Sequence, residues 1–254
     1  MRKKTFLDSN ETQDFIDWLL PFIKGDSNLE QLKYSYKNFH DALNAYEWGE
    51  DEKFEDTFLK FKGFKESLLK SQKDAKKTCL DILEWGGVLP SNQQKIENRP
   101  DMLSFLNTMS KFLQSDSFFL DDLNPNMINS GFTKIYAVLL YGWIMYDGRV
   151  GLALCYLIRE YLTIKGKKEI PSELDFCYGI GRSKKKNRNP NINSNLKFKE
   201  MTHNRTLHFV SNIKANWLLE DIANRIDFAS KKTIPEKMFS LQTVLFVLGD
   251  EIPK

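Results

Sequence analysis

The two residues best placed to do chemistry are Lys134 and Asp147, which lie at the two ends of an apolar run. The twelve residues between them, from Ile135 to Tyr146, are all apolar or glycine. An ionised side chain in such a segment costs on the order of several kcal/mol unless it is paired, caps a helix or takes part in chemistry. We therefore expect the functional site at this pair.

Asp147 precedes Gly148 and a second apolar stretch, so it is expected at the N-terminus of a helix. Two interpretations are open. The carboxylate can simply cap the helix, which stabilises it by about 1 kcal/mol. Alternatively, the helix dipole keeps it ionised, and it stabilises positive charge that develops during a reaction. We expect the second role.

Three roles are open for Lys134: a nucleophile, a phosphate contact or a structural cap. The first requires that burial lower its pKa enough to leave the amine partly neutral. Before it, the turn Gly131-Phe132-Thr133 opens onto a helix. Free backbone N–H groups at such a turn, together with the helix dipole, favour phosphate. We expect Gly131 and Thr133 to contact a phosphate there, and Arg149 to reach a phosphate or a buried acceptor.

These residues resemble a known family. The segment GFTK at 131–134, a helix, and YDGRV at 146–150 are similar to the centre of the helix-hairpin-helix DNA glycosylases, especially their 8-oxoguanine-glycosylase-like branch. That family carries a glycine hairpin ending in Lys, a helix, and then V-D-x-[HR]-V. The resemblance covers about 30 residues, with one hairpin glycine and a shorter Lys-to-Asp interval. It implies a two-lobed helical fold, a catalytic Asp147 and, in bifunctional members, a nucleophilic Lys134.

A basic stretch follows at 182–188, where RSKKKNR holds five cations and no anion. Since the net charge of the chain is only +3, the position of these cations matters more than the sum. We interpret them as a clamp on the DNA backbone, with a merely solvated charge run as an equally weighted alternative. The clamp residues would be Arg182, Lys184, Lys185, Lys186 and Arg188.

Aromatic residues make up 13% of the chain, enough to line a pocket for an extruded base. The residues that we expect there flank the motif or follow one polar helix face: Trp85, Phe132, Tyr136, His208, Asn212 and Trp217. No Glu completes a zinc-protease pattern on that helix, and the three cysteines lack CxxC spacing. We therefore expect no metal and no cofactor.

Hydrophobic periodicity predicts an all-α protein. Helices are expected over 11–24 with a bend at Pro21, over 29–46, over 54–79 with an interruption near Gly63, and over 100–114, 202–226 and 235–248. The polar segment 165–199 is expected to be an exposed loop. We expect a single two-lobed domain over 1–254, with an N-terminal helical part at 1–128 and the motif, basic loop and last helices at 129–254.

The function expected is that of a DNA glycosylase that flips out and excises a damaged or modified base, in repair or in defence against modified viral DNA. A cytoplasmic monomer acting on DNA is expected, because no secretory signal opens the chain and neither apolar half around Asp147 reaches the roughly 20 residues of a membrane span. The alternative is a non-catalytic helical protein that binds nucleic acid through a hairpin phosphate site. The sequence does not indicate which base is the target.

Overall fold

The computed structural model describes residues 1–254 except 50–51, 120–127, 182–184, 229–230 and 232, and leaves out the side chain of residue 203. It is mostly helical, which confirms the all-α class. The helices are α1 (Lys3–Leu7), α2 (Asn10–Lys24), α3 (Phe39–Asn44), α4 (Phe54–Leu68), α5 (Gln72–Trp85), α6 (Gln93–Glu97), α7 (Met102–Leu113), α8 (Ser130–Leu140), α9 (Gly148–Ile164), α10 (Arg205–Arg225) and α11 (Ile234–Leu248). Short 3-10 helices at Leu29–Leu32 and Met201–His203 and a two-stranded parallel sheet, β1 (Cys177–Tyr178) and β2 (Lys199–Glu200), complete the described elements.

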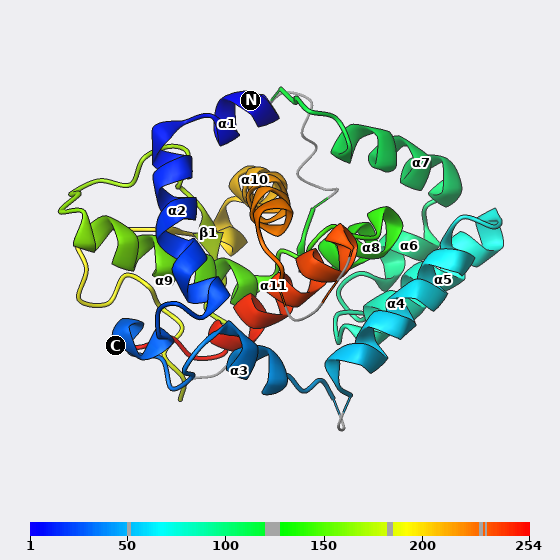
Figure 1. The fold of residues 1–254 in the computed structure, drawn as a ribbon. Coiled ribbons are helices and arrows are strands. Elements are labelled where there is room, and N and C mark those ends of the chain that lie inside the picture. Colours follow the sequence, from blue (N-terminus) through cyan, green and yellow to red (C-terminus); the bar gives the residue numbers. More distant parts are fainter. Residues whose placement is uncertain (50–51, 120–127, 182–184, 229–230, 232) are drawn as a thin grey trace.

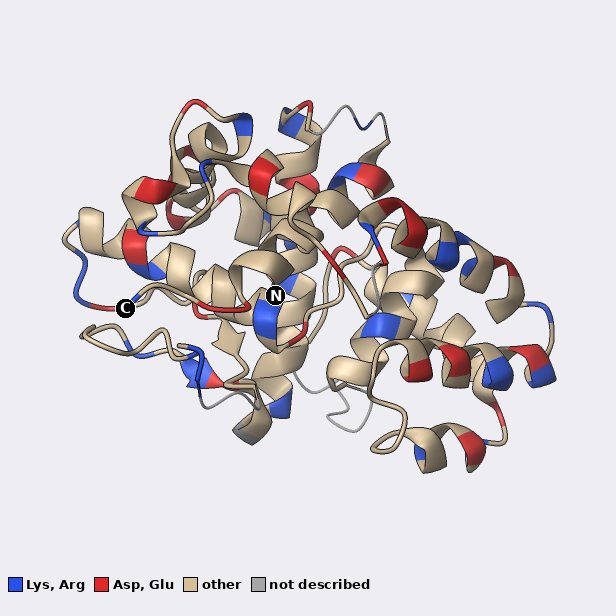
Figure 2. Ribbon diagram, turned by 90° about the horizontal axis from the view of Figure 1, so that it is seen from below, with Lys and Arg blue, Asp and Glu red and all other residues tan. Residues whose placement is uncertain are grey.

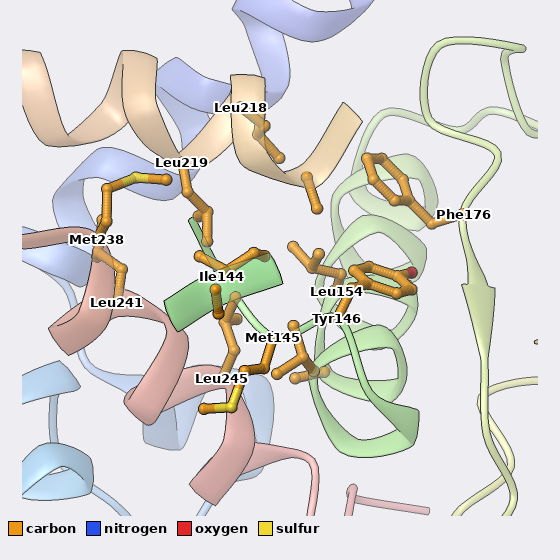
Figure 3. Packing of buried hydrophobic residues seen from close by; sticks show 14 of the residues in the cluster. Ile144, Met145, Tyr146, Leu154, Phe176, Leu218, Leu219, Met238, Leu241 and Leu245 are labelled. Carbon is orange, nitrogen blue, oxygen red and sulfur yellow. The ribbon is translucent and has the colours of Figure 1, made fainter. Parts of the chain in front are cut away.

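The core lies where α9, α10 and α11 meet. Every residue of α9 from Val150 to Arg159 is buried, as is every residue of α10 from His208 to Leu219. Figure 1 shows α10 and α11 in the middle of the molecule, with α2 and α9 on one side and α4 to α7 on the other. In Figure 3, Ile144 and Met145 lie between α10 and α11, so the connection between α8 and α9 passes through the core.

The two halves of the sequence interleave in space. The N-terminal helices α1, α2 and α3 pack on α9, α10 and α11, whereas α8 packs on α4, α5 and α7. The boundary near residue 128 therefore separates segments of the chain but does not separate two packed groups of helices. The helices α8 and α9 lie in different groups of packed helices, so both groups border the space between α8 and α9.

Two of the expected helices have different limits. Residues 29–46 do not form one helix, because Lys33 adopts a left-handed conformation with φ 63° and Asn38 caps a new helix, α3, through the N–H of Asp41. The stretch 54–79 is broken at 69–71 and not near Gly63, which lies inside α4. Ser71 starts α5 by accepting from the N–H of Asp74.

Pro21 was expected to bend or end the helix over 11–24, but α2 contains Pro21 and continues to Lys24. It ends at Gly25, which has a φ of 85°. Proline lies within the last turn here, and its carbonyl still accepts from the N–H groups of Asp26 and Ser27. The Pro21 carbonyl therefore takes part in the hydrogen bonds that close the end of α2, and the proline ring does not stop the helix.

The prediction of an exposed loop at 165–199 is correct only in part, because the described residues are mostly irregular but several apolar side chains are buried. The buried ones are Leu174, Phe176, Cys177, Tyr178, Leu196 and Phe198, whereas Ile180 and Ile192 are exposed. Leu174, Phe176 and Tyr178 follow the period of a strand, as do Leu196 and Phe198, so the pattern carries a short strand signal within an otherwise polar segment. The turn between Asn191 and Phe198 is held by a side chain, because the Asn191 amide accepts from the N–H of Phe198 and donates to its carbonyl. Among the described helices, none combines the length and the apolar character that crossing a membrane requires.

Candidate active site

Lys134 and Asp147 come together in the fold. Lys134 lies one turn into α8 and Asp147 directly precedes α9, and Lys134 Nζ is 3.9 Å from Asp147 Oδ2. Their side chains are 6% and 16% exposed, so the lysine is almost wholly buried while the carboxylate keeps some access to solvent. The pairing expected from the sequence is present as a contact between a buried cation and a partly accessible anion.

Asp147 is the N-cap of α9. Its Oδ1 accepts from the backbone N–H groups of Arg149 at 3.0 Å and of Val150 at 3.1 Å. These two bonds fix the plane of the carboxylate and leave Oδ2 on the side of Lys134. Capping and chemistry are therefore not exclusive here, because one oxygen holds the helix end and the other faces the amine.

Burial lowers the pKa of Lys134 below its usual value of 10.5, although Asp147 acts in the opposite direction; Arg149 adds to the lowering. The amine also donates to the carbonyl of Ser130 at 3.3 Å. The stem of the side chain crosses α5 at Gly86, where an added Cβ would lie 2.4 Å from Lys134 Cδ and 2.7 Å from Cε. Gly86, which directly follows α5, therefore provides the space in which Lys134 lies.

A small pocket opens beside this pair. It is lined by Tyr46, Trp48, Trp85, Lys134, Met145, Asp147, Gln242 and Phe246. Its cavity volume is about 20 Å³, enough for one ordered water molecule. Because this space is too small for a nucleobase, a base can enter only if lining side chains move. Trp48, Trp85 and Phe246 are half-buried, so these aromatic side chains have room to do so.

The aromatic wall of the pocket is built from distant segments. The Trp48 ring lies 5.6 Å from that of Trp85 and 5.6 Å from that of Phe246. Trp48 Nε1 donates to the Trp85 carbonyl, and Trp85 Nε1 donates to Glu52 Oε1, each at 3.1 Å. Glu52 also accepts from Thr57 Oγ1 at 2.7 Å. This network joins the segment before α4 to the end of α5.

The connecting segment, residues 141–147, is held by polar side chains of the central helices. Asn216 Oδ1 accepts from the N–H of Ile144 and Gln242 Oε1 accepts from the N–H of Met145, each at 2.7 Å. His208 Nε2 lies 3.0 Å from the Tyr146 carbonyl. Burial lowers the pKa of His208, so the neutral ring donates from Nε2 to that carbonyl. These three buried groups satisfy irregular backbone and thereby position Asp147.

Of the six residues expected in a base pocket, only Trp85 lines this one. Phe132 and Tyr136 are buried on α8 in contact with each other. His208 and Asn212 are buried on α10, His208 behind Tyr146 and Asn212 with an amide nitrogen that has no partner among the described residues. Trp217 lines a separate cavity of about 370 Å³ together with Trp143, at the other end of the connecting segment.

The turn at Gly131 and Thr133 does not offer a free phosphate site in this structure. The N–H groups of Gly131 and Phe132 donate to Asn129 Oδ1 at 2.8 and 3.0 Å. Thr133 is fully buried and its hydroxyl donates to Ser130 O. Gly131 packs so closely that an added Cβ would lie 2.7 Å from Asn92 Nδ2. The direct DNA contacts expected of these residues are therefore not supported by their placement.

The basic residues have mixed placements. Arg182 and Lys184 lie outside the described residues, and Lys185 is exposed. Arg149, Lys186 and Arg188 converge on one carboxylate, that of Asp250. Elsewhere, cations and anions alternate along the helices at the right of Figure 2, α4 to α7. The Asp250 cluster is therefore a local concentration of positive charge at the start of α9.

Among the described residues, no three His, Cys, Asp or Glu side chains lie close enough together to hold a metal ion. The three cysteines are free, buried thiols. Comparison of the chain with models of protein families, with curated proteins and with solved structures finds no significant match.

Proposed function

We propose that this protein is a DNA glycosylase, which extrudes a damaged or modified nucleotide from the duplex and breaks its N-glycosidic bond. The observation that carries the proposal is the pair formed by Lys134 and Asp147. A buried lysine of lowered pKa lies 3.9 Å from a carboxylate whose direction is fixed by two N–H groups, beside a pocket walled by tryptophans. These are the groups that cleavage at a sugar carbon requires.

Asp147 stabilises the charge that the reaction creates. As the bond from C1′ to the base breaks, its electron pair leaves with the base and positive charge builds on the sugar. Asp147 and Lys134 both line the pocket, and Asp147 Oδ2 lies 3.9 Å from Lys134 Nζ, while Oδ1 is held by the backbone. Because the carboxylate is already oriented, it stabilises the cationic sugar without reorganising during the reaction.

Two nucleophiles fit the site. One is a water molecule, for which the pocket has room beside Asp147. The other is the neutral amine of Lys134, whose population increases because burial lowers its pKa. Attack by the amine forms a bond from Nζ to C1′; loss of a proton from nitrogen and opening of the sugar ring then give a Schiff base that borohydride reduces to a stable amine.

The aromatic wall supplies a surface for the extruded base. Trp48, Trp85 and Phe246 border the pocket, and every nucleobase presents a face that stacks on such rings. Movement of the half-buried tryptophans would open a space next to Asp147. The target base is set by contacts made after that movement.

The proposal is tested by incubating the purified protein with DNA duplexes that carry oxidised, alkylated, deaminated or glycosylated bases. Mass spectrometry of the small-molecule fraction should detect one class of released base. Asp147→Asn should abolish the release and keep DNA binding, because Asn caps a helix about as well as Asp but carries no charge. Binding of DNA with every base left attached would instead identify a non-catalytic nucleic-acid-binding protein.

Borohydride separates the two nucleophiles. A covalent adduct between protein and DNA that forms in the wild type and is lost in Lys134→Met would assign the amine. A matched control is Lys65→Met, which removes another lysine of lowered pKa, one on α4 whose Nζ lies 4.8 Å from the Tyr141 ring centroid. Base release without an adduct would assign water.

A further inference from the structure

Three cations surround the carboxylate of Asp250, directly after α11. Arg149 Nη2 lies 3.2 Å from Asp250 Oδ1, Arg188 Nη2 donates to the same oxygen at 2.6 Å, and Lys186 Nζ pairs with Oδ2. Partial burial acts to raise the pKa of Asp250, but the hydrogen bond from Lys186 and the charges of Arg149 and Arg188 outweigh it, so the pKa is lowered. The carboxylate is therefore ionised, and the cluster carries a net charge of +2 from three cations and one anion.

The cluster borders the proposed active site. The guanidinium of Arg149 stacks on Phe246, 4.4 Å from the ring centroid, and Phe246 lines the pocket of Lys134 and Asp147. The backbone N–H of Arg149 also binds Asp147 Oδ1. A phosphate bound by these cations would thus lie next to a nucleotide whose sugar is at Asp147.

The backbone around Asp250 is fixed independently of its side chain. Asn187 donates from Nδ2 to the Ile252 carbonyl at 2.9 Å and accepts from the Ile252 N–H at 3.0 Å through its own carbonyl. Arg188 Nε donates to the backbone carbonyl of Asp250 at 2.8 Å. Arg188 itself crosses Gly181, where an added Cβ would lie 2.3 Å from its Nη1. Arg149, which stacks on Phe246, Arg188 and the chain around Asp250 therefore keep contacts that do not depend on the carboxylate.

Two of the three cations are accessible, whereas the side chain of Arg188 is only 11% exposed. The side chains of Arg149 and Lys186 are 34% and 43% exposed, and that of Asp250 is 28% exposed. A carboxylate and a phosphodiester each present two oxygens that share a negative charge, and guanidinium groups bind both in the same way. Asp250 thus occupies, in the protein alone, the place that a phosphate oxygen would take.

We propose that Arg149, Lys186 and Arg188 form a binding site for a DNA backbone phosphate and that Asp250 occupies this site until the phosphate displaces its carboxylate. This inference rests on the proposed function, since it assumes that DNA is the ligand of the neighbouring pocket. Asp250 acts as an internal competitor. It weakens binding of DNA that is not held by further contacts at the pocket.

The test compares wild type, Asp250→Asn and a matched control, Glu11→Gln, on an undamaged DNA duplex. Glu11 is a suitable control because it pairs with Lys167 at 2.7 Å on an exposed surface, and its loss changes the net charge equally. Asp250→Asn should bind about three- to tenfold tighter than the wild type, and the logarithm of its affinity should fall more steeply with salt, by up to about 0.9 in slope for one added phosphate contact. Glu11→Gln should change both quantities less.

Equal or weaker binding by Asp250→Asn, with the fold intact by circular dichroism, would overturn the inference, because Asp250 would then order the cations without competing. An effect no larger than that of Glu11→Gln would also overturn it. No base release is measured in this test, so its failure leaves the glycosylase proposal standing. If no variant binds DNA, the increase in unfolding temperature caused by pyrophosphate is measured for wild type and Asp250→Asn. A larger increase for Asp250→Asn supports the phosphate site while the DNA function fails. Equal increases overturn both the phosphate site and the DNA function.

Discussion

Asp147 makes different contacts through its two carboxylate oxygens. One oxygen accepts two N–H groups and begins α9, and the other lies 3.9 Å from a buried amine. Its partner Lys134 is buried because α8 and α5 pack closely at Gly86. The site therefore depends on the glycine at residue 86 as much as on the charged groups of Lys134 and Asp147.

We predict that Gly86→Ala displaces Lys134. A methyl group there would meet the middle of the lysine stem at 2.4 Å, so the side chain has to take another path. A displacement of about 1 Å costs on the order of 100-fold in rate when the displaced group reacts. The measurement is the rate of the borohydride-trapped adduct. Gly63→Ala is the control, since an added Cβ meets nothing within 4 Å there, and an unchanged rate in Gly86→Ala would contradict the account.

The pH dependence of the adduct follows from the burial of Lys134. Only the neutral amine attacks, and its fraction rises with pH until the pH passes the pKa of Lys134, which lies below the 10.5 of an ordinary lysine. The rate of adduct formation should therefore rise with pH and level off below 10.5. Initial rates measured across the alkaline range check this. A midpoint at or above the ordinary value would show that the reacting amine is not buried.

At the scale of elements, the site depends on how α10 and α11 hold the connecting segment. Asn216 and Gln242 each accept one backbone N–H of residues 144 and 145, inside the core. Buried N–H groups are costly to leave without a partner, so the amides determine the path of this irregular segment. The path of the connecting segment therefore determines the position of Asp147.

We expect Gln242→Met to lower the free energy of unfolding by about 1–3 kcal/mol, because the N–H of Met145 loses its acceptor while the volume is kept. Base release should slow as well, since the segment leads directly into Asp147. Denaturant unfolding gives the first quantity. The exposed Gln94→Met on α6 is the matched control, and equal stability of the two variants would remove the proposed role of Gln242.

The local part of the site was predictable and the rest was not. Lys134 and Asp147 stand out because a charge in an apolar run is visible within one segment. Tyr46, Trp48, Gln242 and Phe246 come from segments about 90 residues or more away from them, and nothing in their local pattern indicates a common pocket. The buried residues of the loop at 165–199 were hard to predict for a related reason, since their strand-like alternation covers only short stretches and amide side chains shape the turns.

In the whole molecule, the two halves of the sequence interleave, so the helices that form the core also position the site. The helices before residue 45 cover α9, α10 and α11, and those that surround the pocket from the other side are α4, α5 and α8. Buried polar groups of α10 are therefore coupled to global stability. Lys214 is the clearest case, being 1% exposed.

Lys214 should make stability depend on pH in a defined window. Burial lowers its pKa from 10.5 to about 8, and Nζ donates to the carbonyls of Ser172 and Asp175 at 3.0 and 3.1 Å. Between these two pKa values the unfolded chain binds more protons than the folded one, so the contribution of Lys214 to stability rises with pH there and is lowest below the folded value. The wild type should gain stability relative to Lys214→Met as pH rises through this window.

Urea unfolding of both proteins at several pH values measures this difference. Tyrosines and cysteines whose pKa is raised by burial weaken the fold at alkaline pH, but they are present in both proteins and cancel in the comparison. A difference between wild type and Lys214→Met that does not change with pH would show that the Lys214 amine has an ordinary pKa in the folded protein.

The central claim is that Asp147 stabilises the cationic sugar during base release. Its most direct test is single-turnover release of the target base, once identified, by wild type and Asp147→Asn at saturating protein. The account predicts at least about a 100-fold slower release by the variant, as for other groups that stabilise charge in a transition state, with DNA affinity and unfolding little changed. Release by Asp147→Asn at the wild-type rate would contradict it.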